Sequence, residues 1–128
     1  MRASHLMRPG RVVAEVGDGT LKMTSKRLEP GCWIISDTHG FAIGHSVWAQ
    51  TPIAVMGRVL ATPLELRSKC VVGTPVCSGP NGTVSMMTRN EVMQYPEAII
   101  GTISEIPSYE YWGPDKIPVN NRIWIRIR

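Results

Sequence analysis

Glycine and proline interrupt this chain at intervals of a few residues, and this spacing constrains the fold more than any other feature of the sequence. The 128 residues include 12 glycines and 10 prolines, which occur throughout the chain. Because both residue types weaken or end helices, long helices have little room here. The spacing is typical of short strands joined by turns, so we predict a mainly β, small barrel-like domain of short antiparallel strands.

Length and composition favour one globular domain. Hydrophobic residues make up 43% of the chain and charged residues 19%, a balance typical of a folded protein. No apolar run approaches the roughly 20 residues of a membrane helix, so we predict a soluble chain without membrane insertion. Residues 1–10 have no signal-peptide pattern and are interpreted as a flexible lead-in or expression remnant, and residues 11–128 as a single β domain.

The charge pattern and the cysteines argue against two common kinds of protein. The net charge of +4 comes from scattered basic residues, whereas a nucleic-acid interface needs a concentrated basic stripe, so no nucleic-acid partner is predicted. Cys32, Cys70 and Cys77 contain no C-x-x-C pair, so neither a disulfide framework nor a zinc ribbon is indicated. We predict three reduced, buried thiols.

Turn signals divide the chain into predicted elements. Asp18-Gly19 and Asn81-Gly82 are typical hairpin turns. Thr88 and Glu91 have the spacing of a capping box, which predicts one short helix over about 88–94. The aromatic-rich residues 108–121 are predicted to form a loop. Strands are predicted over residues 11–16, 21–25, 32–36, 71–78, 83–87 and 98–107.

The segment from Thr51 to Pro63 reads as one strand without a polar face. Alternation places one set of side chains on one face and the other set opposite, and the only charged residue is Arg58. Both faces therefore need a cover. Gly57 and Gly101 lie within predicted strands, which indicates a bulge, a covering ring or the close approach of another backbone. The two faces consist of Ile53, Val55, Gly57 and Val59, and of Ala54, Met56, Arg58 and Leu60.

The segment 122–128 alternates cleanly and predicts a half-exposed strand that closes a sheet. Its isoleucines share one face, and Trp124 shares the other with the arginines, whose guanidinium groups can stack on its ring. A second interpretation stays open, in which the polar face is a ligand surface for a glycan or a nucleic acid. The residues of that surface are Arg122, Trp124 and Arg126.

No catalytic constellation is predicted. The acidic residues Asp18, Glu29 and Asp37 all lie at predicted turns, where such side chains commonly bond to the backbone. Ser36 and Ser46 lack the G-x-S-x-G context of a nucleophilic serine, although histidines lie nearby.

No metal site or cofactor is predicted either. The candidate metal ligands Cys32, His39 and His45 have intervals that match no familiar zinc pattern.

The order of these segments resembles the C-terminal domain of tail-fibre and appendage-like proteins from phages and prophages of Firmicutes. The likeness covers most of the chain from Arg8 to Arg128, and it is most specific in Gly57-Arg58-Val59, "IIGTISEIP" and "NRIWIRI". Related fibres often carry a self-cleaving chaperone domain of the glutamic-peptidase type, which drives trimer assembly. Its acidic, aromatic motif is absent here, so no catalytic residue is transferred and no enzyme activity is expected.

The resemblance implies a homotrimeric cap of a virion tail fibre, made in the bacterial cytoplasm and attached to an upstream fibre region. In such a trimer, one face of the 51–63 strand would fill the core and the other would contact neighbouring chains. Which face does which stays open. A glycan-binding fibre tip and an autoproteolytic chaperone remain alternatives. The strand residues assigned to core or trimer interface are Ile53, Val55, Met56, Arg58 and Leu60.

Overall fold

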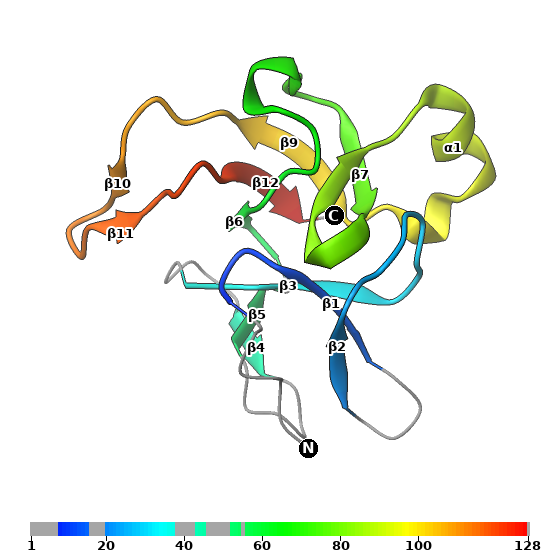
Figure 1. Ribbon diagram of the computed structural model, residues 1–128, viewed down its shortest axis with the longest axis horizontal. Helices are drawn as coiled ribbons and strands as arrows, with labels where there is room; N and C mark the ends of the chain where they lie inside the picture. Colours follow the sequence, from blue (N-terminus) through cyan, green and yellow to red (C-terminus); the bar gives the residue numbers. More distant parts are fainter. Residues whose placement is uncertain (1–7, 16–19, 38–42, 46–51, 55, 128) are drawn as a thin grey trace.

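The computed structural model contains two five-stranded antiparallel sheets and a separate two-stranded hairpin (Figure 1). It describes residues 8–15, 20–37, 43–45, 52–54 and 56–127. The mainly β fold class is confirmed.

The first sheet has the strand order β2-β1-β3-β5-β4. Strands β1 and β2 form an antiparallel pair, as predicted, although the Asp18-Gly19 turn between them lies outside the described residues. The strands of this sheet are β1 (Val12–Glu15), β2 (Leu21–Met23), β3 (Cys32–Ile35), β4 (Ile43–His45) and β5 (Pro52–Ala54).

The second sheet has the order β6-β12-β9-β7-β8, and backbone hydrogen bonds join β8 to the segment that follows β6. The chain leaving β6 passes beside β8, where Leu64 donates to the carbonyl of Val84 at 2.8 Å and Val84 donates to that of Thr62 at 2.9 Å. This contact makes the sheet barrel-like. Its strands are β6 (Arg58–Ala61), β7 (Pro75–Ser78), β8 (Val84–Met86), β9 (Gly101–Glu105) and β12 (Ile123–Ile127).

The main hydrophobic core lies between the two sheets. Val12, Ile34 and Ala54 from the first sheet pack with apolar residues of the second sheet, including Val59 and Ile125. Gly10 is also buried, and its backbone bonds to Ile35 and Thr62 at 2.7 and 2.9 Å. The folded unit therefore includes Gly10, which corrects the predicted end of the lead-in, whereas residues 1–7 lie outside the described residues.

The predicted continuous strand from 51 to 63 is wrong. The chain bends at Met56 and Gly57, so β5 enters the first sheet and β6 the second. Gly57 has a backbone φ of +81°, a conformation that residues other than glycine rarely adopt. Alternation of apolar residues cannot reveal such a bend, because two buried strands in succession give the same pattern.

Both faces of β6 are covered within one chain. Val59 and Ala61 enter the main core, while Leu60 packs with Val119 and Trp124 in a separate cluster. The β6 segment therefore needs no neighbouring chain to cover it.

Other residues assigned to the core or interface have mixed positions. Ile53 is buried, Arg58 is half-buried, and Met56 is exposed. Val55 lies outside the described residues.

The prediction of a half-exposed final strand is also wrong. Strand β12 lies inside the second sheet, between β6 and β9. Trp124 is 2% exposed and Arg122 is 4% exposed. Of the three residues of the proposed ligand surface, only Arg126 is therefore exposed. The stacking predicted for Trp124 involved an arginine of the same segment, whereas the guanidinium over its ring is that of Arg58 in β6, 4.6 Å from the ring centroid.

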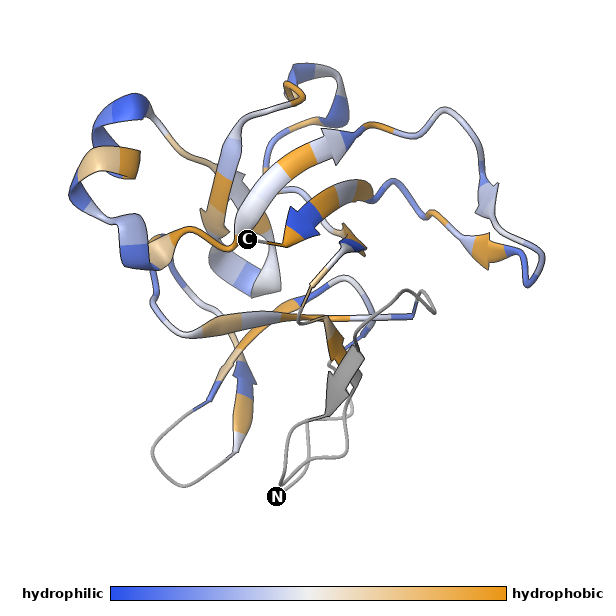
Figure 2. Ribbon diagram, turned by 180° about the vertical axis from the view of Figure 1, so that it is seen from behind, coloured by the Kyte–Doolittle hydropathy of each residue, from blue (hydrophilic) through white to orange (hydrophobic). Residues whose placement is uncertain are grey.

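The cover over Trp124 comes from the segment predicted to be a loop. Residues 111–118 contain β10 (Tyr111–Trp112) and β11 (Ile117–Pro118), which pair as a hairpin. The Trp112 ring meets the Trp124 ring edge-on at 5.1 Å between centroids. The hairpin projects to one side of the second sheet (Figures 1 and 2).

The short helix is confirmed as α1 (Arg89–Gln94). Its capping box is present, because Thr88 accepts from the Glu91 amide and Glu91 accepts from the Thr88 amide. Short 3-10 turns that were not predicted also occur, namely η1 (Arg67–Lys69), η2 (Pro80–Gly82) and η3 (Pro96–Ala98). The predicted strand 71–78 is shorter than expected, because only residues 75–78 enter the sheet.

Candidate functional site

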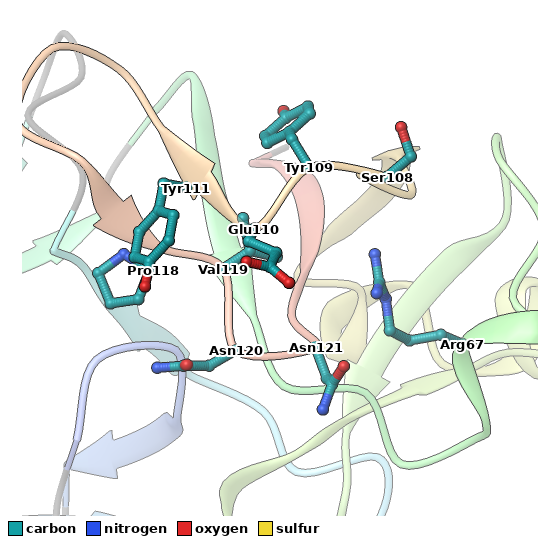
Figure 3. Close-up of a pocket in the computed structure, with 9 residues that line it drawn as sticks. All are labelled: Arg67, Ser108, Tyr109, Glu110, Tyr111, Pro118, Val119, Asn120 and Asn121. Carbon is teal, nitrogen blue, oxygen red and sulfur yellow. The ribbon is translucent and has the colours of Figure 1, made fainter.

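A polar groove lies beside the β10–β11 hairpin and is called here the hairpin groove (Figure 3). Its volume is about 450 Å³, within the roughly 300–1,000 Å³ typical of ligand pockets. It is lined by Arg67, Ser108, Tyr109, Glu110, Tyr111, Pro118, Val119, Asn120 and Asn121.

The hairpin and the turn that follows it hold this groove. Tyr111 pairs with Pro118 across the hairpin, and the Val119 amide donates to the carbonyl of Glu110 at 2.8 Å. Asn120 and Asn121 follow, with φ of 51° and 64°. Asparagine tolerates this left-handed conformation better than most residues, so the pair turns the chain sharply into β12.

Tyr109 connects the groove to the buried interior. Its hydroxyl accepts a hydrogen bond from the indole nitrogen of Trp124 at 2.7 Å. A buried indole N–H needs such a partner, and this bond anchors the phenol at the groove wall. Tyr111 is 59% exposed.

Arg67 brings a cation to the opposite wall. One terminal nitrogen of its guanidinium donates to the carbonyl of Pro107. Its Nε is buried and has no hydrogen-bond partner among the described residues, and none of the ion pairs they form involves Arg67. Figure 3 shows its guanidinium and the Glu110 carboxylate facing the same open space.

A second hollow adjoins the hairpin groove. The two share Pro118 and Asn120, and the second has a volume of about 390 Å³. Its other lining residues are Arg8, Pro9, Arg11, Asp37, Thr62 and Arg122.

Within this hollow, Arg122 and Asp37 form an ion pair. The guanidinium donates to both carboxylate oxygens, at 2.9 and 3.0 Å. Their charges offset one another.

Another ion pair ties the helix to the rest of the protein. Arg27 donates to both oxygens of Glu91 and to the hydroxyl of Ser85. The Arg27 hydrogen bond, helped by the Thr88 amide, lowers the pKa of Glu91 to about 2. Ser85 in turn donates to Glu65 at 2.9 Å, so these polar groups satisfy one another.

The acidic residues singled out in the sequence have structural contacts. Glu29 accepts from the amides of Ser25 and Lys26 at 2.9 and 3.1 Å, which stabilises a turn. Asp37 accepts from Arg122, and Asp18 lies outside the described residues.

The cysteine thiols are free and protonated at neutral pH. Burial raises the pKa of Cys32 to about 12, and it also raises the pKa values of Cys70 and Cys77. Because the thiolate is the nucleophile and the metal ligand, these thiols are unreactive at neutral pH. Cys70 and Cys77 are buried as predicted, while Cys32 is half-buried.

Most of the remaining candidate residues for metal binding and catalysis lie outside the part of the chain that the structure describes. His39 and Ser46 are outside the described residues, the side chain of His45 is not described, and Ser36 is buried. Within the ranges that the structure describes, no three His, Cys, Asp or Glu side chains are placed to hold a metal ion. Those ranges also contain no helix that is long and apolar enough to cross a membrane.

The groove residues were missed in the sequence because residues 108–121 contain no recognised motif. The available signal was the combination of tyrosines in "SYEYW" with the consecutive asparagines Asn120 and Asn121. Aromatic rings and amides side by side are typical of recognition surfaces. No protein-family model, curated protein or solved structure matches the chain.

Proposed function

We propose that this chain is a non-catalytic structural and assembly domain that forms a homotrimeric cap of a phage or prophage tail fibre. Its site of action is then the virion, and its other partner is the upstream region of the fibre. The resemblance of the sequence to fibre domains supports this proposal.

The observation that carries the proposal is a group of exposed apolar side chains between β6 and β7. This group is called here the β6–β7 patch. Contiguous exposed apolar surface is typical of sites that bind another protein, and this one short connection supplies four exposed apolar side chains. The patch consists of Leu64, Leu66, Val71 and Val72, which are 43%, 67%, 60% and 58% exposed.

The test is the mass of the protein in solution. We expect multi-angle light scattering at micromolar concentration to give three times the 14.1 kDa of one chain. Leu66→Asp and Val72→Asp place charges in the patch, and both variants should become monomers that keep the wild-type circular dichroism spectrum. Met93→Asp, on helix α1 and 75% exposed, is the control and should remain trimeric.

Two outcomes contradict the proposal. A wild-type protein that is monomeric at micromolar concentration removes the assembly role. Specific self-cleavage, detected by intact-mass spectrometry after days at neutral pH, contradicts the non-catalytic assignment.

A further inference from the structure

We propose that the hairpin groove binds an oligosaccharide chain that carries acidic groups. This inference goes beyond the assembly role and does not depend on the oligomeric state. It rests on the aromatic rings, the hydrogen-bonding groups and the balance of charge in the groove.

The aromatic component consists of Tyr109 and Tyr111. Their side chains are 36% and 59% exposed, and both line the groove. Tyrosine offers a rigid ring of large area at a low cost in conformational entropy. The C–H face of a sugar ring packs against such a surface, while the sugar hydroxyls remain free to form hydrogen bonds.

The polar component suits a ligand rich in hydroxyl groups. Asn120 and Asn121 offer amide donors and acceptors, Ser108 offers a hydroxyl, and Glu110 offers two acceptor oxygens. Groups of this kind, placed around an aromatic surface, fix the orientation of a bound ligand.

The balance of charge favours acidic groups on that ligand. Arg67 has no carboxylate partner in the described part of the chain, and its buried Nε lacks a hydrogen-bond acceptor there. A ligand carboxylate in the groove would pair with the guanidinium of Arg67, whose charge none of the ion pairs among the described residues offsets. Arg8 and Arg11 line the adjoining hollow, where Arg122 is already neutralised by Asp37. Apart from Asp37, which is paired with Arg122, Glu110 is the one carboxylate among the residues that line the two hollows, so the lining carries more positive than negative charge.

The shape favours a chain over a single sugar. Pro118 and Asn120 line both the hairpin groove and the adjoining hollow, so a hollow lined by Arg67 lies next to one lined by Arg8. A linear acidic oligosaccharide would bring sugar rings and carboxylates to both.

Isothermal titration of the full chain with oligogalacturonate tests this inference. We expect saturable binding that weakens as salt is added, because the cations of the groove contribute to it. Neutral malto-oligosaccharide of the same length should bind at least about tenfold more weakly, a difference of about 1.4 kcal/mol.

Matched variants locate the site. Tyr111→Ala and Arg67→Gln should each weaken binding at least about tenfold, a loss of about 1.4 kcal/mol. The controls are Tyr95→Ala and Arg89→Gln, which change exposed residues outside the groove and should bind as the wild type does. Thermal unfolding checks the fold of each variant, and Tyr111→Ala is sufficient by itself if Arg67→Gln is unstable.

Four results overturn the proposal. Three of them are the absence of saturable binding, equal binding of the neutral chain, and wild-type affinity in folded Tyr111→Ala. Displacement by inorganic phosphate at the same concentration as the sugar indicates a simple anion site and also overturns it. Light scattering on the same samples keeps this outcome separate from the oligomeric state.

Discussion

Replacing Arg122 with methionine removes a buried cation that joins the two sheets. Arg122 precedes β12 in the second sheet, whereas its partner Asp37 follows β3 in the first. Its Nε donates to the carbonyl of Val119 at 3.0 Å, and one terminal nitrogen also donates to that of Pro118 at 2.5 Å. Methionine keeps much of the aliphatic arm but makes none of these hydrogen bonds.

The structure sets the size of the effect. Removing one partner of a buried ion pair costs about 3–5 kcal/mol, because the other charge is left uncompensated. The Asp37 side chain is 26% exposed, so water can partly hydrate it, and we expect a loss of about 3 kcal/mol for Arg122→Met. Asp37→Asn leaves the guanidinium of Arg122, which is 4% exposed, without its counter-charge, and its cost should be at least as large.

Urea unfolding followed by tryptophan fluorescence measures both losses. The double variant completes a cycle, and we expect the two changes to be coupled by about 1–3 kcal/mol because the residues are in direct contact. Arg126→Met is the control, since Arg126 is an exposed arginine of β12 and should change stability by less than about 0.5 kcal/mol. A loss below about 1 kcal/mol for Arg122→Met, or independent effects in the cycle, would refute the reasoning.

Two further predictions concern stability. The pKa of Glu91 is lowered from 4.5 to about 2, so its contribution to stability should be complete above pH 4.5 and lost as the pH falls towards 2. Because the Arg27 side chain is 36% exposed, we expect ionised Glu91 to contribute about 1–2 kcal/mol to the free energy of unfolding. Urea unfolding of the wild type and of Glu91→Gln at each pH measures this contribution. A difference between the two proteins that does not change with pH would contradict the prediction. A Cβ at Gly101 would lie 2.2 Å from the carbonyl oxygen of Arg126. Gly101→Ala should therefore lower the free energy of unfolding by about 1–3 kcal/mol in the same assay. An unchanged unfolding midpoint would contradict the close approach of the two backbones.

Local signals in the sequence predicted local structure well. Asn81-Gly82 predicted the β7–β8 hairpin, and the Thr88 capping box predicted α1, because each depends on residues close together in the chain. Gly101 also behaved as expected, since a backbone carbonyl occupies the space that a side chain would need. These interactions are encoded within a few residues.

Long-range pairing was the part that the sequence could not supply. The bend at Gly57 sends β5 and β6 into different sheets, and apolar alternation is the same with or without it. The charge of Arg122 suggested solvent exposure, whereas the carboxylate that permits its burial is Asp37, far away in the chain. The hairpin groove also depends on distant residues, since it joins Arg67 to the 108–121 segment, which itself contains no recognised motif.

The position of β12 between β6 and β9 has a consequence for synthesis on the ribosome. Strand β6 is made before the other four strands of the second sheet. Strand β12, which separates β6 from β9, is made after both of them. The first sheet can therefore form while the second still presents unpaired edges, which are prone to pair with other chains. Completion of the second sheet must follow translation of β12, so β6 and β9 cannot reach their native arrangement before that strand has been made.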